Sequence, residues 1–130
     1  MFKFAVVLGI VYLIYTVWKS NRHSARTRYG YEAEESIASY LRRCGAEVWL
    51  SNGSRGPIDV YAQWSKSRRW AIQIKASRDG LARIPRPGER ERLIVASREW
   101  RARAVIALRE YGRTTYLDAR TSQRLNAPRS

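Results

Sequence analysis

The most informative segment for predicting the fold is residues 54–77, SRGPIDVYAQWSKSRRWAIQIKAS. It contains two runs, IDVYAQW and WAIQIKA, in which apolar and polar residues alternate, and the polar segment SKSRR separates them. A Gly-Pro pair precedes the first run and interrupts regular structure there. This pattern predicts two β-strands, over residues 58–64 and 70–76, that form an antiparallel hairpin.

The apolar residues of the hairpin predict its register. Pairing about Ser67 places Trp64 opposite Trp70, and two further apolar pairs follow: Ala62 with Ile72 and Val60 with Ile74. A slip by one residue would move this apolar set to the other face of the sheet. The other face then carries Asp59, Tyr61, Gln73 and Lys75, with Asp59 directly across from Lys75. On an ordinary sheet such a pair is a solvent-facing salt bridge, and that interpretation stays open.

The residues before the hairpin predict a helix and a strand. Between residues 29 and 44 the apolar positions fall three or four residues apart, as on one face of an amphipathic helix: Ala33, Ile37, Tyr40, Leu41 and Cys44. Gly45 is expected to end this helix. Residues 46–50, AEVWL, then predict a short strand.

The residues after the hairpin predict a second helix and two closing strands. The segment 88–104, GERERLIVASREWRARA, has apolar residues at helical spacing: Leu93, Ala96, Ser97, Trp100 and Ala104. The strands VIALREY and TTYLDA follow and join around Gly112. Residues 121–130 are expected to be a mobile tail.

The first residues differ in composition from the rest. Residues 4–18 contain no charge, and Tyr12, Tyr15 and Trp18 suit a membrane interface. At 1.5 Å per residue, about 17 residues span roughly 25 Å, the short end for a bilayer core. We therefore expect a transmembrane anchor over residues 1–19. A cleaved signal peptide and an apolar helix buried in a partner are the alternatives.

Charges beside the apolar segment predict its orientation. Four basic residues follow it directly, in or beside the basic linker 20–28: Lys19, Arg22, Arg26 and Arg28. They outweigh Lys3 and the amino terminus, so the positive-inside rule places the C-terminal part in the cytoplasm. The single cysteine, Cys44, cannot form an internal disulfide, which fits a reducing compartment.

The net charge indicates a polyanionic partner. The 130 residues include 25 Lys+Arg against 11 Asp+Glu, a formal net charge of +14, and most of the basic residues are arginine. The planar guanidinium suits phosphate recognition, in nucleic acid or on an anionic lipid surface. A high-GC genome or a thermophilic host is the alternative source of the arginine excess.

The motifs GYEAEESIASYL, SNGSRGPIDVYA and WAIQIKAS, in this order, resemble the PD-(D/E)xK nuclease superfamily, and within it archaeal Holliday junction resolvases and Mrr-type restriction endonucleases. The resemblance covers about residues 29–120. It implies an α/β domain with a restriction-endonuclease-like αβββαβ core and a mixed central sheet. It also implies that the domain is a metal-dependent DNA endonuclease.

The resemblance assigns four positions of the active site: Glu34, Asp59, Gln73 and Lys75. Asp59, the Gln73 side-chain oxygen, the Ile74 carbonyl and Glu34 would hold Mg²⁺ or Mn²⁺, which prefer oxygen ligands. Lys75 would position the attacking water or stabilise charge on the phosphate. Gln73 departs from the commoner Glu or Asp, although Mrr-type members carry a similar glutamine, and its neutral amide predicts weaker metal binding.

The resemblance also implies DNA as the partner and a homodimer, since two nicks need two sites. Arginines near the site are expected to contact phosphates: Arg55, Arg78, Arg83 and Arg86. Serines at Ser51 and Ser54 lie where resolvases place a serine, and a turn-forming role explains them equally well. A nuclease-fold protein that binds DNA without catalysis, and a lipid-binding protein, are the alternative functions.

Overall fold

A computed structural model describes residues 30–51, 56–77 and 82–129 of the chain. The segment from Glu32 onward forms one compact unit. Within the described ranges, no helix is both long and apolar enough to cross a membrane. The predicted anchor and basic linker, residues 1–19 and 20–28, lie outside the described residues.

The described elements follow the predicted order. A helix over residues 30–43, here called the first helix, comes before three strands, a second helix and three further strands. These elements are β1 Glu47–Leu50, β2 Val60–Ser65, β3 Arg68–Ser77, α2 Pro87–Glu99, β4 Arg103–Glu110, β5 Arg113–Asp118 and β6 Arg124–Leu125.

All six strands belong to one mixed sheet, in the order β1-β2-β3-β4-β5-β6. Strands β3 and β4 are parallel, and every other neighbouring pair is antiparallel. Because parallel neighbours need a long crossover connection, α2 links β3 to β4. The predicted αβββαβ order with a mixed sheet is confirmed, and β5 and β6 extend the sheet beyond it.

The first helix ends where the sequence predicts. Gly45 has φ 96°, a conformation that glycine adopts without steric cost. The Ala46 N–H donates to the Leu41 carbonyl at 3.1 Å, and the Gly45 N–H donates to the Arg42 carbonyl at 3.0 Å. These two bonds form a Schellman motif, which satisfies carbonyls at the helix end and turns the chain into β1.

Helix α2 is shorter than the predicted helix over residues 88–104. It ends at Glu99, because Arg101 takes a positive φ of 54° and breaks the helical path. The Ala102 N–H then donates to the Ser97 carbonyl at 2.9 Å, so a non-glycine residue closes the same kind of end motif. Residues 103 and 104, predicted as helix, instead begin β4.

The hairpin register differs from the predicted one by two residues. Ala62 pairs with Trp70, and Val60 pairs with Ile72. The strands are joined by a two-residue turn at Lys66 and Ser67, and the pairing shifts between Gln63 and Ser65. A shift of two residues keeps each side chain on its predicted face, because the side-chain period of a strand is two. The Trp64 and Trp70 rings still meet, edge to face, with centroids 5.2 Å apart.

The predicted tail, residues 121–130, is partly a strand. Asp118, at the end of β5, is buried and accepts backbone N–H bonds from Arg120 at 2.8 Å and Thr121 at 3.1 Å. Its other carboxylate oxygen accepts from Arg103 at 3.0 Å. This side-chain turn reverses the chain, and Arg124–Leu125 then pairs with β5 as β6.

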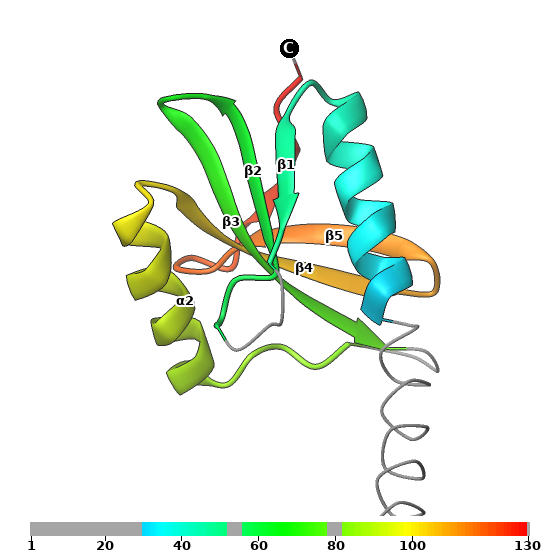
Figure 1. The fold of residues 1–130 in the computed structure, drawn as a ribbon. Coiled ribbons are helices and arrows are strands. Elements are labelled where there is room, and N and C mark those ends of the chain that lie inside the picture. Colours follow the sequence, from blue (N-terminus) through cyan, green and yellow to red (C-terminus); the bar gives the residue numbers. More distant parts are fainter. Residues whose placement is uncertain (1–29, 52–55, 78–81, 130) are drawn as a thin grey trace, which may run out of the picture. The chain divides into compact units, whose positions relative to one another are not determined.

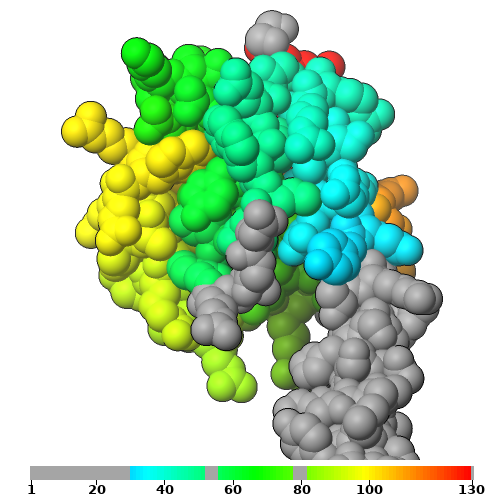
Figure 2. All heavy atoms as spheres, in the orientation of Figure 1, coloured from blue at the N-terminus to red at the C-terminus, as the bar shows by residue number. Residues whose placement is uncertain are grey.

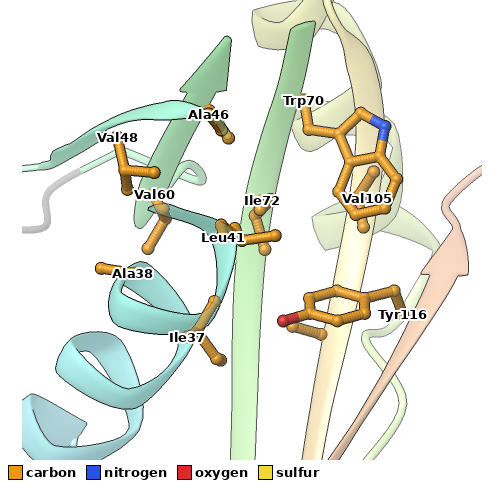
Figure 3. Close-up of a cluster of buried hydrophobic side chains, with 12 residues drawn as sticks. Ile37, Ala38, Leu41, Ala46, Val48, Val60, Trp70, Ile72, Val105 and Tyr116 are labelled. Atoms are coloured by element: carbon orange, nitrogen blue, oxygen red, sulfur yellow. The ribbon is translucent and has the colours of Figure 1, made fainter. Parts of the chain in front are cut away.

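The two helices cover opposite faces of the sheet (Figure 1). The first helix packs on a core of aliphatic and aromatic side chains, which we call the first-helix face: Ile37, Ala38, Leu41, Val60, Trp70, Ile72, Val105 and Tyr116, among others (Figure 3). Helix α2 packs on a second core, the α2 face: Ile58, Ala71, Leu93, Ile94, Ala104, Ile106, Leu108 and Ala119. In the space-filling view, strand residues separate the atoms of α2 from those of the first helix (Figure 2).

Candidate active site

Asp59 sits at the point where the chain enters β2. Its backbone N–H donates to the Ile72 carbonyl at 2.8 Å, and its carbonyl accepts from the Ser51 N–H at 2.9 Å. Its carboxylate oxygen Oδ2 accepts the Ile74 backbone N–H at 2.8 Å. These bonds join Asp59 to the residue that follows β1 and to the middle of β3, so its carboxylate is fixed beside Ile74.

The protein environment raises the pKa of the Asp59 carboxyl. Burial is the largest cause, and the hydrogen bond from Ile74 and the positive charge of Lys75 oppose it. The pKa of Glu34, on the first helix, is raised by burial, then by the charges of Asp59 and Glu35. Asp59 therefore interacts electrostatically with both Glu34 and Lys75. Two carboxylates that repel each other in this way would be stabilised by a cation between them.

Gln73 lines a cavity and has a buried side-chain oxygen. Its side-chain Oε1 is inaccessible to solvent and accepts no hydrogen bond from the part of the chain that the structure describes. The cavity, of about 300 Å³, is lined by Gly56, Pro57, Gln73, Lys75, Glu89 and Arg92. A buried carbonyl oxygen without a donor is energetically costly.

The predicted register places Lys75 directly across from Asp59, and the observed register does not. The Lys75 ammonium Nζ instead lies 2.9 Å from the Glu89 carboxylate oxygen Oε2, and about one third of each side chain is exposed. The two-residue shift of the hairpin moves Lys75 along β3, past Asp59. Both Gln73 and Lys75 still face the same cavity, as the period of the strand predicts.

The structure brings only some of the predicted site residues together. Glu34, Asp59 and Lys75 form an electrostatic cluster, and Gln73 joins Lys75 at the cavity. Ile74 contributes its N–H to Asp59. Arg83 and Arg86 are exposed in and beside the segment that leads into α2, whereas Arg55, Arg78 and Ser54 fall outside the described residues.

Sequence reasoning missed Glu89 and Arg92. Glu89 lies in the first turn of α2, where Pro87 opens the helix, and Arg92 follows one turn later. The α2 segment alternates acidic and basic residues, so nothing in it marks Glu89 apart from Glu91. A carboxylate at the third position of a helix is favoured by the helix dipole, which is the only local signal.

The oxygen donors of the site fit a divalent cation such as Mg²⁺, although the described residues contain no cluster of three or more His, Cys, Asp or Glu side chains arranged to hold one. The Asp59 carboxylate and Gln73 Oε1, which accepts no hydrogen bond from the described residues, are oxygen ligands of the kind that Mg²⁺ prefers. With two carboxylates, Glu34 and Asp59, and one amide, Gln73, the predicted ligand set carries less negative charge than three carboxylates would.

The mixed six-stranded sheet with a helix on each face fits a restriction-endonuclease-like fold. The structure is similar to that of Hjc, a Holliday junction resolvase from the archaeal hyperthermophile Archaeoglobus fulgidus, with a TM-score of 0.59. The alignment has 20% sequence identity and covers 72% of this chain and 81% of the resolvase chain. This similarity supports the relationship to the nuclease-like resolvases at the level of the fold. No family model matches the chain, and no curated protein matches it.

Proposed function

We propose that this protein is a metal-dependent DNA endonuclease, of resolvase-like or Mrr-like type, that is tethered to the membrane. The observation that carries the proposal is that Asp59 interacts electrostatically with Lys75 and Glu34, while Gln73 lines a cavity with Lys75, on a fold similar to that of a Holliday junction resolvase. An acid, an oxygen ligand and an ammonium are the kinds of group that metal-assisted phosphodiester hydrolysis uses.

Each residue has a role that its side chain can fill. Asp59 and Gln73 would hold Mg²⁺ or Mn²⁺, with Glu34 behind Asp59 and the Ile74 carbonyl as a further ligand. The bound cation would polarise the scissile phosphate and lower the pKa of an attacking water. The Lys75 ammonium would donate a hydrogen bond to that water or to a phosphate oxygen, where charge develops.

The surroundings of the site supply DNA contacts. Arg83 and Arg86 are exposed, and Arg92 lines the cavity, so cationic groups surround the place where a phosphate would bind. Arg55 and Arg78 remain predicted contacts. Such contacts are independent of sequence and sensitive to salt, which suits an enzyme that recognises DNA shape. A homodimer would bring two sites to the two strands of a junction.

Residues 4–18 are proposed to anchor the protein, with the C-terminal domain in the cytoplasm. Cell fractionation tests this part of the proposal. An anchored protein stays with the membranes in high salt and is released by detergent, whereas a peripheral basic protein is released by salt alone. Release by salt would contradict the anchor.

The activity is tested with the full chain in detergent micelles. Wild type and Lys75→Ala are incubated with Mg²⁺ or Mn²⁺ and with linear duplex, single-stranded or four-way-junction DNA. We expect metal-dependent cleavage that Lys75→Ala reduces by about 100-fold or more, because the ammonium acts on charge in the transition state. If the wild-type protein cleaves none of these DNAs, or if Lys75→Ala cleaves them as fast as wild type, the proposed nuclease activity is contradicted.

A second candidate function is DNA binding at the membrane without catalysis. The neutral Gln73 favours it, because an amide in place of a carboxylate removes one negative charge from the cation site. This candidate predicts that the wild-type protein binds junction DNA with the same affinity with and without Mg²⁺, and that no product appears.

A further inference from the structure

Lys75, which is proposed to act on the scissile phosphate, is paired with a carboxylate from a distant segment. Its ammonium Nζ lies 2.9 Å from Glu89 Oε2, and the two residues come from the end of β3 and the first turn of α2. A phosphate oxygen that binds this ammonium has to share it with the carboxylate or replace the carboxylate. Because two anions at one ammonium repel each other, replacement is favoured.

The charges around Glu89 are those of an anion site. Among the residues that line the cavity, Lys75 and Arg92 are cationic, and Glu89 is acidic. The contact with Lys75 lowers the pKa of the Glu89 carboxyl most, and the charges of Arg86 and Arg92 lower it further. The Glu89 carboxylate is therefore an anion held among cations, in the environment that a phosphate group would also favour.

The ion pair is open to exchange with an anion from solvent. About one third of each of the two side chains is exposed. The cavity beside them, of about 300 Å³, is at the small end of the range for small-molecule sites. Exposed ion pairs contribute little to the stability of a fold, so folding does not require the carboxylate to stay on Lys75.

The carboxylate and an isolated phosphate do not compete on equal terms. Glu89 is tethered to the site by its own helix, so its effective concentration beside Lys75 is high. A single phosphate has to displace it unaided. A phosphate in a DNA strand is also tethered, because neighbouring phosphates of the same strand bind other cationic side chains.

We propose that Glu89 is a specificity-determining residue, which occupies Lys75 against isolated anions and is displaced by a phosphate of a DNA strand. This inference rests on the proposed function for the role of Lys75, and it defines the class of ligand that the cavity accepts. Discrimination by a group placed against the wrong ligand is a general source of specificity.

DNA binding without divalent cations tests the proposal, because no cleavage then interferes. Fluorescence anisotropy with four-way-junction DNA, at one ionic strength and with EDTA, measures affinity for the full chain in detergent micelles. The proteins are wild type, Glu89→Gln, Lys75→Ala and the double variant. Glu91→Gln is the matched control, because Glu91 lies two residues further along α2, is exposed and does not line the cavity.

We expect Glu89→Gln to bind the junction about 5-fold or more tighter than wild type, because the phosphate no longer has to displace a like charge. Glu91→Gln is expected to stay within about twofold of wild type, since an exposed charge outside the cavity is screened. The gain from Glu89→Gln should be smaller by about twofold or more when Lys75 is Ala, because no ion pair then has to be broken.

Inorganic phosphate tests the exclusion of isolated anions. The thermal unfolding midpoint is measured in phosphate and in chloride of equal ionic strength, and the chloride value also reports the folding of each variant. Phosphate is expected to raise the midpoint of Glu89→Gln more than those of wild type and Glu91→Gln, whose equal shifts report the general effect of the salt.

Three results overturn the proposal: DNA binding by Glu89→Gln that is equal to or weaker than that of wild type, an equal gain with and without Lys75, or the same phosphate response in Glu89→Gln and Glu91→Gln. Failure of the proposed function looks different. If the gain depends on Lys75 but the wild-type protein cleaves no DNA, the nuclease is removed and the role of Glu89 stands. If the wild-type protein cleaves DNA and Glu89→Gln binds it no more tightly, the role of Glu89 is removed and the nuclease stands.

Discussion

The two faces of β3 differ in what covers them. On the first-helix face, Trp70 and Ile72 are buried under the first helix, in a core that continues into β4 and β5 (Figure 3). On the α2 face, Ala71 is buried, but Gln73 and Lys75, further along the strand, line a cavity at the first turn of α2. Neighbouring residues of one strand thus serve a closed core on one side and an open polar site on the other.

The two helices differ in how much apolar surface they bury against the sheet. The first helix covers its face with aliphatic side chains, and its described end is closed by a complete hydrogen-bonded motif. Helix α2 buries fewer side chains, Leu93, Ile94 and Ser97, and its first turn is charged. The start of α2 lines the cavity through Glu89 and Arg92, and the opposite face supplies most of the burial that stabilises the sheet.

The largest expected effect separates the two faces at adjacent positions of β3. Ile72→Ala is expected to lower the free energy of unfolding by about 2–5 kcal/mol, because Ile72 is fully buried and the substitution leaves a cavity. Gln73→Ala is expected to change it by less than about 1 kcal/mol, since the oxygen it removes has no partner among the described residues. Denaturant unfolding of both variants measures the difference. Equal losses would mean that the α2 face is also a closed core.

A smaller effect of opposite sign is expected at Asp59. Asp59→Asn removes a partly buried charge whose pKa burial raises, and the amide oxygen can still accept the Ile74 N–H. We expect it to stabilise the protein by about 1 kcal/mol at pH 7, because the substitution removes a charge whose ionised form burial disfavours.

The size of this effect depends on pH in a defined way. The folded carboxyl binds its proton more readily than the unfolded one, whose usual pKa is 3.8. Ionised Asp59 therefore costs stability above the folded pKa, and the cost disappears as pH falls through that pKa toward 3.8. The advantage of Asp59→Asn should shrink over this interval. Asp118→Asn is the control, and it should destabilise, because Asp118 pairs with Arg103 and holds two backbone N–H groups.

The smallest expected effect concerns DNA binding beside the α2 face. Arg83→Ala is expected to reduce the slope of log K against log salt by about 1, with little change in sequence preference, as for the loss of one phosphate contact. Arg98→Ala, at the other end of α2, is the matched control, and its slope should equal that of wild type. Binding to four-way-junction DNA at several salt concentrations measures both. An equal fall in both variants would show a diffuse basic surface without a DNA-facing side.

Local pattern was sufficient to predict the element order and the mixed sheet. The helical spacing of Ile37 and Leu41, the glycine at Gly45 and the alternation in β2 and β3 each act within a few residues, and the structure agrees with them. The errors occur where a distant contact or a rare conformation decides. Arg101 ends α2 with a positive φ that arginine seldom adopts, and the Asp118 side chain turns the predicted tail back to form β6.

For the site, the sequence determined which residues share a face, and the tertiary structure decided which of them meet. Gln73 and Lys75 face one cavity because strand side chains alternate with period two, and a register error of two residues leaves this parity unchanged. The ion-pair partner of Lys75 could not be predicted from the two-residue period of the strand. It is Glu89, and the contact exists because the β3-to-β4 crossover packs the first turn of α2 over the end of β3, which no local pattern encodes.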